Sequence, residues 1–282
     1  MFKQITIIAP GLLGASLGAA VRARKLAERV VIWARREETR EQCLRLDWCD
    51  AVEADVGAAA RGSALVVICA PVEAIPQLAK AAAATLSAGS LITDVGSTKA
   101  EICAALVGAL PGGVEFVGSH PMAGSEKSGL EHADAELFDG RCCLVTPAEG
   151  NTESAIGQVQ AFWRAVGMET HLLNPKLHDQ VVAELSHLPH VLASVLAAYL
   201  SRNPAEWRAF AGGGLRDTTR IAAGSVPMWM DILRQNREAI LRSLDGFRAD
   251  LDVFAEALKS ADESQLKDVL ESGQSFRKDL DR

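Results

Sequence analysis

Residues 118–129 concentrate reactive side chains between small residues. His120, Ser125 and Glu126 lie there, directly after the apolar run at residues 114–117. This order places a histidine where a strand ends and a loop begins, and an imidazole there can accept or donate a proton near neutral pH. A single loop histidine can equally be a backbone contact, so the elements around it must decide between these interpretations.

Two further polar motifs lie in the second half of the chain. His187 and His190 are three residues apart in an apolar stretch, so on a helix they share a face. Neither a carboxylate nor a cysteine stands at ligand spacing around them, which argues against a metal site. Arg220 belongs to an Arg-Asp-Arg cluster after the glycines at 212–214, where a guanidinium can meet a carboxylate ligand. The alternative is a surface cluster of salt bridges.

The elements that must position these side chains begin with a strand, a turn and a helix. Residues 5–9 are apolar and rich in β-branched side chains, as in a buried parallel strand, and a glycine-containing turn and a helical stretch follow directly. This order is typical of a dinucleotide-binding loop, whose helix N-terminus faces a pyrophosphate. Ala9 stands in place of the first glycine of the usual G-x-G-x-x-G pattern. We expect cofactor contacts at Gly11, Leu12, Leu13 and Gly14.

The end of the next predicted strand, residues 30–34, indicates which dinucleotide binds. NAD-binding proteins usually carry an acid here to hold the ribose hydroxyls. This chain has Arg35 and Arg36, which can hold a 2′-phosphate through paired hydrogen bonds. We therefore predict NADP in preference to NAD. Alternatively, the arginines begin a solvated helix, and Glu37 or Glu38 reaches the ribose.

Two more buried strands, at residues 64–70 and 90–95, lead to the same edge of the sheet. Ligands of open α/β sheets bind at the carboxyl ends of the strands. We therefore expect Ala70 and Pro71 to contact the cofactor, and Ser97 to lie near both the cofactor and His120. Ser97 can also serve as a helix N-cap, and the two roles are compatible.

The chain changes character after residue 174. Strand patterns give way to long amphipathic stretches, which predict helices at residues 177–201, 204–211, 228–257 and 264–280. We therefore divide the chain into a Rossmann-like α/β domain, residues 1–174, and an all-helical domain, residues 175–282. Several helical faces are apolar, which favours a homodimer formed through the second domain.

Composition excludes several classes of protein. The chain has 282 residues and a net charge of −7, whereas nucleic-acid binders usually show a basic surface. Its six cysteines form no CxxC pair, which fits a reducing cytoplasm. Apart from the glycine-interrupted N-terminus, no stretch comes near the ~20 apolar residues of a membrane span. We expect neither a nucleic acid nor a membrane as partner.

Taken together, these stretches resemble the prephenate/arogenate dehydrogenase family of tyrosine biosynthesis. The motifs follow the family's order over almost the whole chain, at residues 11–17, 94–99 (DVGSTK), 119–126 (SHPMAGSE), 186–190 (SHLPH) and 217–222 (DTTRIA), with Trp229. The departures are Ala9 and the sequence Ala34-Arg35-Arg36, which lacks the acid of NAD-using members.

The resemblance implies oxidative decarboxylation of prephenate with hydride transfer to NAD(P)⁺. His120 would accept the hydroxyl proton, with Ser97 fixing the geometry, and Arg220 would bind a substrate carboxylate. The remaining substrate contacts would be His187, His190, Ser125 and Glu126.

Three alternatives stay open at this point. Arogenate differs from prephenate only in its side-chain ammonium. A dehydrogenase of the β-hydroxyacid type would need a lysine within the first helix of the second domain, but Lys176 only precedes that helix. A non-catalytic NADP-binding redox sensor would not need His120, Arg220 and Ser97 together.

Overall fold

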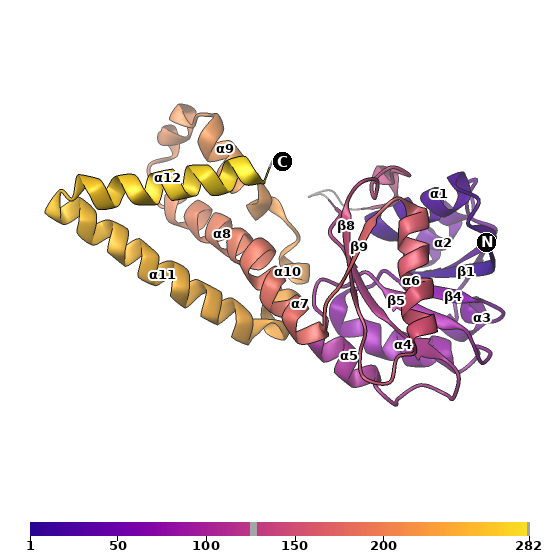
Figure 1. Ribbon diagram of the computed structural model, residues 1–282. Coiled ribbons are helices and arrows are strands. Elements are labelled where there is room, and N and C mark those ends of the chain that lie inside the picture. Colours follow the sequence, from indigo (N-terminus) through magenta and orange to yellow (C-terminus); the bar gives the residue numbers. More distant parts are fainter. Residues whose placement is uncertain (125–128, 281–282) are drawn as a thin grey trace.

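The computed structural model describes residues 1–124 and 129–280, which form an α/β part and a helical part (Figure 1). The α/β part, indigo to magenta in Figure 1, contains the N-terminus, and the orange and yellow helices extend away from it. Within the described residues no strand follows Leu172, so the predicted fold class is confirmed.

A six-stranded parallel sheet forms the centre of the α/β part. Its order is β3-β2-β1-β4-β5-β6. The strands are β1 (Phe2–Ile8), β2 (Ala27–Trp33), β3 (Ala51–Glu53), β4 (Leu65–Ile68), β5 (Leu91–Asp94) and β6 (Glu115–Phe116). The order reverses between β1 and β4, so a crevice for a ligand opens at their carboxyl ends.

Helices and short turns connect these strands. They are α1 (Leu12–Ala23), α2 (Glu37–Cys43), α3 (Val56–Ala60), a 3₁₀ turn (Val72–Ala74), α4 (Ile75–Ala83) and α5 (Ala100–Leu106). The sheet has an apolar layer on each face because neighbouring residues of each strand point to opposite sides. Leu65 and Val67 join one buried cluster, and Val66 and Ile68 join the other.

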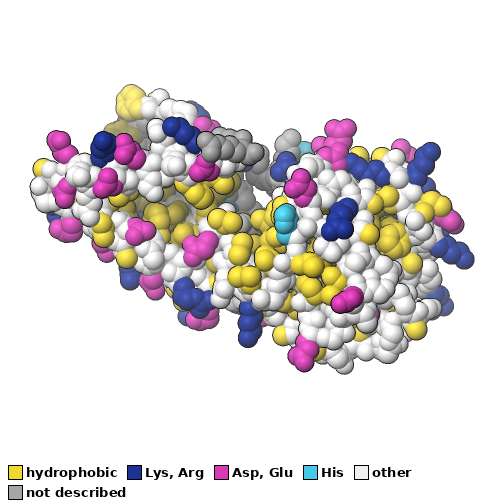
Figure 2. Space-filling view, viewed as in Figure 1, with side chains coloured by type: hydrophobic (Ala, Val, Ile, Leu, Met, Phe, Trp, Pro, Cys, Tyr) yellow, Lys and Arg dark blue, Asp and Glu magenta, His cyan; other side chains and the backbone are white. Residues whose placement is uncertain are grey.

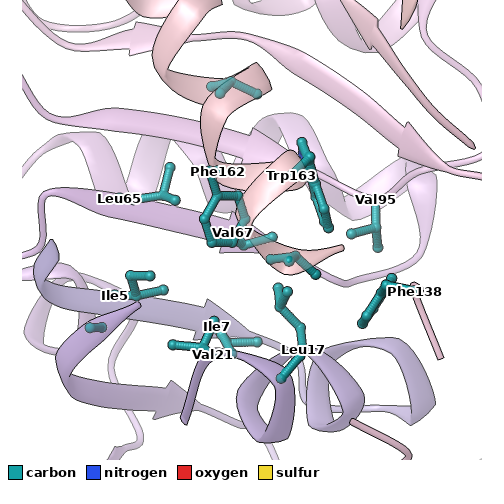
Figure 3. Packing of buried hydrophobic residues seen from close by; sticks show 14 of the residues in the cluster. Ile5, Ile7, Leu17, Val21, Leu65, Val67, Val95, Phe138, Phe162 and Trp163 are labelled. Atoms are coloured by element: carbon teal, nitrogen blue, oxygen red, sulfur yellow. The ribbon is translucent and has the colours of Figure 1, made fainter. Parts of the chain in front are cut away.

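The larger apolar cluster packs α6 (Glu153–Val166) against the sheet. Phe162 and Trp163 of this helix share the cluster with Ile5, Ile7 and Leu17, as Figure 3 shows. Thr152 caps α6, because its hydroxyl accepts a hydrogen bond from the Ala155 N–H. The cluster therefore joins the first strand to the last helix of the α/β part.

A second, three-stranded sheet carries the candidate histidine. It contains β7 (Gly118–Pro121), β8 (Cys142–Thr146) and β9 (Glu169–Leu172), with β7 and β8 antiparallel. The prediction of a single strand followed by a loop is wrong here. The strand is interrupted at Val117, between β6 and β7, and His120 lies inside β7. The reason is a long-range contact, because the Ser119 N–H donates to Asp94 Oδ1 (3.0 Å) and its hydroxyl to the Asp94 carbonyl (2.8 Å).

The helical part begins with one long helical segment. It comprises α7 (Pro175–Val182), a π-helical turn (Ala183–His187) and α8 (Leu188–Leu200). The expectation that Lys176 precedes this helix is wrong, because Lys176 lies in its first turn. Pro189 lies in the first turn of α8, where the missing N–H of proline explains the widened turn before it.

Contrary to the sequence-based expectation, the segment Pro175–Leu200 is long and apolar enough to cross a membrane by length and composition. The core helix of a soluble protein passes the same test.

The remaining helices complete the helical part. They are α9 (Gly213–Thr219), α10 (Val226–Gln235), α11 (Arg237–Ser260) and α12 (Glu263–Asp279), with 3₁₀ turns at Ala205–Phe210 and Arg220–Ala223. Figure 1 shows α11 and α12 as a long hairpin directed away from the sheets. The stretch predicted as one helix over 228–257 is interrupted at Asn236, whose side chain bonds to the first helix of this part.

The turn before α1 departs from the usual glycine pattern. Ala9 adopts a left-handed backbone conformation with φ of 65°, at the position where the pattern has its first glycine. A side chain at Gly14 would lie 3.0 Å from the Ala9 carbonyl oxygen and 3.2 Å from the Cys69 Cβ, so this position needs a glycine for helix packing. At Gly11 no atom lies within 4 Å of where a Cβ would stand, which leaves the loop accessible to a phosphate.

Replacing Ala9 with glycine should raise the free energy of unfolding by about 1 kcal/mol. The left-handed conformation destabilises an alanine by roughly 1–2 kcal/mol, and a glycine avoids this strain. The greater flexibility of glycine in the unfolded chain offsets part of the resulting stabilisation. Urea unfolding at fixed protein concentration measures the difference. Lys25→Gly is the matched control, since Lys25 has φ of 55° in an unrelated loop. A destabilised Ala9→Gly protein beside a stabilised Lys25→Gly protein would contradict the prediction.

Candidate active site

His120 lies where the two parts of the chain meet. Its side chain is buried in β7, with 7% of the residue exposed. Its Nδ1 atom is 2.9 Å from the Nε2 atom of His178, which α7 supplies. The candidate base is therefore held by a residue of the helical part, 58 positions further along the chain.

Asp179 continues this contact into a chain of three side chains. The Nδ1 atom of His178 is 2.8 Å from Asp179 Oδ1. The same carboxylate accepts the backbone N–H groups of Lys99 (2.8 Å) and Ala100 (3.0 Å) at the start of α5. Asp179 thus fixes α7 to α5 and orients the imidazole next to His120.

Burial keeps these imidazoles neutral. The pKa of His120 is well below the usual 6.5, first because of burial and then because of His178, Lys99 and His187 nearby. Burial also lowers the pKa of His178, although its hydrogen bond to Asp179 opposes the shift. The pKa of His187 falls to about 4, again mainly through burial. A neutral imidazole is the form that can accept a proton.

A fully buried ion pair lies near His120. The Asp94 carboxylate pairs with the Lys99 ammonium, and both side chains have no exposed surface. Asp94 also accepts the N–H groups of Gly96 (2.8 Å) and Ser119 (3.0 Å). The pair therefore fixes the end of β5 against β7 and places a positive charge near His120.

The helical part contributes His187, a buried histidine with one unused ring nitrogen. Its Nδ1 atom is 3.1 Å from Asn236 Nδ2, and the same amide donates to the Asp179 carbonyl (2.7 Å). An amide nitrogen only donates, so His187 Nδ1 accepts and its Nε2 carries the hydrogen. Among the described residues this Nε2 is buried and has no hydrogen-bond partner. A buried N–H without a partner costs about 1–3 kcal/mol, which a ligand oxygen would recover.

His190 is stacked on Trp229. The ring centroids are 3.5 Å apart and the planes differ by 8°. A Cβ at Gly224 would lie 3.0 Å from Trp229 Nε1 and 3.2 Å from His190 Cε1, so the backbone passes directly against this pair. Gly224 ends the turn that Arg220 begins, and this turn packs against α8.

The structure thus groups several of the sequence-predicted residues. His120 and His187 share one buried cluster, and the turn of Arg220 lies beside the stacked pair. Ser97 follows β5 at the carboxyl edge of the sheet, but within the described residues its hydroxyl makes no hydrogen bond, and His120 bonds to His178 instead. The predicted contacts Ser125 and Glu126 lie outside the described residues.

Sequence reasoning missed His178, Asp179 and Asn236. The available signal was an adjacent His-Asp pair in the first helix after the domain junction. Asn236 carried no comparable signal, because it lies within a stretch whose pattern predicts continuous helix.

A cavity of about 700 Å³ opens at the carboxyl ends of β1, β2 and β4. Its lining includes predicted cofactor contacts from separate loops, namely Gly11, Arg35, Arg36, Ala70 and Pro71. Leu12 begins α1, Leu13 packs against the core and Gly14 packs against β1, so they support the loop without lining the cavity. The described lining residues do not include Glu37, Glu38 or Ser97. The open space beside Gly11, the start of α1 and two guanidinium groups fit a phosphate-bearing dinucleotide.

This combination defines the class of protein. A parallel sheet with a dinucleotide cavity, joined to a helical domain through a buried neutral histidine, is the arrangement of a nicotinamide-dependent dehydrogenase.

Comparison with known proteins identifies the family. Residues 17–172 match the family model "Prephenate dehydrogenase, nucleotide-binding domain", and residues 174–272 match "Prephenate dehydrogenase, dimerization domain". The chain belongs to the prephenate dehydrogenase family, and it is an NAD(P)-dependent oxidoreductase.

Individual relatives agree with this assignment. Cyclohexadienyl dehydrogenase of Zymomonas mobilis is 34% identical over 281 residues, covering 98% of this chain and 96% of that protein. Prephenate dehydrogenase of Bacillus subtilis is 30% identical over 284 residues, covering 99% and 76%. The crystal structure of prephenate dehydrogenase from A. aeolicus in complex with hydroxyphenyl propionate and NAD⁺ has a TM-score of 0.92, with 27% identity and 99% coverage of both chains.

Replacing Asp94 with asparagine should destabilise the protein by about 3–5 kcal/mol. The change leaves the Lys99 ammonium buried without a counter-ion, and such half-removed pairs are strongly destabilising. Chemical unfolding measures the effect. The double variant Asp94→Asn with Lys99→Met should recover much of the loss, because it removes the unpaired charge as well. An Asp94→Asn protein as stable as the parent would contradict the role given to this pair.

Proposed function

We propose that this chain converts prephenate to 4-hydroxyphenylpyruvate by oxidative decarboxylation, with NADP⁺ as the preferred hydride acceptor, in tyrosine biosynthesis. The observation that carries this proposal is His120, a buried neutral base at the junction between the cofactor-binding part and the helical part. The A. aeolicus relative was crystallised with hydroxyphenyl propionate and NAD⁺, and the first of these has the phenol and carboxylate of the expected product class.

The reaction needs one base and no net release of a proton. Prephenate carries a ring hydroxyl opposite a ring carboxylate. The nicotinamide, when bound, would accept hydride from the carbon that bears this hydroxyl. His120 accepts the hydroxyl proton as that carbon is oxidised. The bond to the ring carboxylate then breaks as CO₂ leaves, and its electron pair makes the ring aromatic. His120 returns the proton to the ring oxygen, which restores the neutral base.

The helical part supplies the groups that recognise the substrate. His187 donates its unused Nε2–H to a substrate oxygen, and the stacked ring of His190 forms an apolar wall. Arg220 binds a substrate carboxylate as a two-pronged donor. Ser97, at the sheet edge, orients the substrate hydroxyl. The contacts predicted for Ser125 and Glu126 stay predictions.

Charge at the rim of the cofactor cavity favours NADP. Arg35 and Arg36 line the cavity next to Trp33, and both are exposed. The acids that follow them, Glu37 and Glu38, are not among its described lining residues. Guanidinium groups bind a 2′-phosphate through paired, charge-assisted hydrogen bonds.

The helical part also supports a homodimer. Large apolar side chains stand exposed on its helices, including Leu185, Val195, Tyr199, Leu251, Leu258, Leu270 and Phe276. Figure 2 shows hydrophobic side chains gathered over α8 and between α11 and α12. A second copy of the same surface would cover them, in accord with the dimerization-domain match. We place this dimer in the cytoplasm, where its free cysteines stay reduced.

Initial rates with prephenate and arogenate, each crossed with NADP⁺ and NAD⁺, test the function. Prephenate with NADP⁺ should give the largest kcat/KM, measured as reduced cofactor and as 4-hydroxyphenylpyruvate formed. His120→Asn should lower kcat at least about 100-fold because the proton acceptor is lost, while NADP⁺ still binds with unchanged affinity. Arogenate as the better substrate would transfer the proposal to that compound. A protein that binds NADP⁺ but turns over neither substrate would be the redox sensor instead.

The double variant Arg35→Ala with Arg36→Ala tests the cofactor preference. It should raise KM for NADP⁺ about 10-fold, because two charge-assisted bonds are lost and each is worth up to about 1 kcal/mol at an exposed site. KM for NAD⁺ should change little, since that cofactor has no 2′-phosphate. Arg40→Ala controls for a change in the structure of the loop, because its guanidinium bonds to the Ala34 and Arg35 carbonyls. This variant should affect KM for both cofactors equally. Equal losses of the double variant with both cofactors would contradict phosphate binding by the two arginines.

A further inference from the structure

The hydrogen bonds around His120 determine which of its nitrogens can act as a base. Asp179 Oδ1 is 2.8 Å from His178 Nδ1, and a carboxylate accepts hydrogen bonds but donates none. His178 Nδ1 must therefore carry a hydrogen. Because a neutral imidazole carries only one, His178 Nε2 is left as an acceptor.

The same reasoning extends one residue further. His178 Nε2 is 2.9 Å from His120 Nδ1, so His120 Nδ1 must donate to it. The single hydrogen of neutral His120 is then on Nδ1. Its Nε2 carries a lone pair, which is the form that can accept the proton of a ring hydroxyl.

The first link of this chain is held from several sides. Asp179 accepts two backbone N–H groups at the start of α5, so both of its oxygens are fixed. Its backbone carbonyl accepts from Asn236, whose amide also contacts His187. Both Asp179 and His178 are buried, with 5% and 0% of the residue exposed, so water does not compete for these bonds.

From this geometry we infer that His178 and Asp179 are positioning residues, which hold His120 as its Nδ1–H tautomer and leave Nε2 as the proton acceptor. The inference rests on the proposed function of His120 and specifies its reacting atom. The pair also stabilises the charged form of His120 during turnover, because the Nδ1–H bond strengthens when the ring takes a second proton. A similar logic operates in the serine protease triad, where an aspartate fixes the tautomer of the catalytic histidine.

The resting protein allows a direct test without substrate. Nitrogen-15 chemical shifts of the ring nitrogens report which one is protonated, and the chain has only six histidines. The His120 signals are assigned by their loss in His120→Asn. We expect Nδ1 protonated and Nε2 unprotonated near neutral pH. His171→Gln is the matched control, because His171 is exposed on β9 and its loss should leave the His120 signals and turnover unchanged. A protonated Nε2 would overturn the inference.

The variant Asp179→Asn tests the consequence for catalysis. An asparagine whose amide nitrogen replaces Oδ1 donates to His178 Nδ1 and loses the bond from the Lys99 N–H. This reverses every donor in the chain and protonates His120 Nε2. We expect inverted nitrogen shifts and a kcat at least about 100-fold lower. KM for substrate should also rise, because Asp179 attaches α7 to α5, so the nitrogen shifts separate the effect on the tautomer from the effect on docking. An unchanged kcat would overturn the inference.

A second pair of variants leaves the α5 contacts of Asp179 in place. His178→Gln keeps an oxygen that can accept from His120 Nδ1, whereas His178→Leu offers none. The glutamine variant should retain at least about 10-fold more kcat than the leucine variant. Equal losses would overturn the inference. If the parent turns over neither prephenate nor arogenate, the proposed function fails, and the tautomer assignment is then decided by the nitrogen shifts alone.

Discussion

The carboxylate of Asp179 is the contact on which the active site depends. It accepts the first backbone N–H groups of α5 and so attaches the helical part to the sheet. It also holds His178, which holds His120. One buried carboxylate therefore sets the position of a domain and the orientation of a base, and both functions require that its oxygens be fully bonded.

The α/β part prepares the other side of this contact. The buried pair of Asp94 and Lys99 fixes the end of β5, and Asp94 also accepts a hydrogen bond from the Ser119 N–H of β7. His120 follows at the next position of β7, so its ring meets α7 at a defined distance. The ammonium of Lys99 nearby opposes protonation of His120 in the resting protein. The buried ion pair therefore helps to keep His120 neutral, the form that can accept a proton.

The sequence predicts much of this arrangement but misses the contacts between distant residues. Apolar runs and the glycine turn predict β1, β2, β4, β5 and the strand that begins with β6, but not the short edge strand β3. The one irregular position of that turn, Ala9, has a left-handed backbone. His120 was expected in a loop, because nothing local to residues 115–121 specifies the hydrogen bonds from Ser119 to Asp94. His178 and Asp179 were missed for the same reason, since their partners lie 58 and 80 positions away. Local patterns specify elements, whereas the reacting geometry comes from pairs that only the folded chain brings together.

The division of labour between the two parts has a chemical consequence. The α/β part holds the cofactor cavity and His120, but the group that orients His120 belongs to α7. A His120 without His178 would have no partner to fix its tautomer, and its neutral ring would place the hydrogen on either nitrogen. Under the proposed function, docking of the helical part would complete the base, and it would also bring His187 and the His190–Trp229 pair to the substrate. Because Asp179 bonds both to the start of α5 and to His178, the proposed function makes substrate recognition and proton acceptance depend on the same contact.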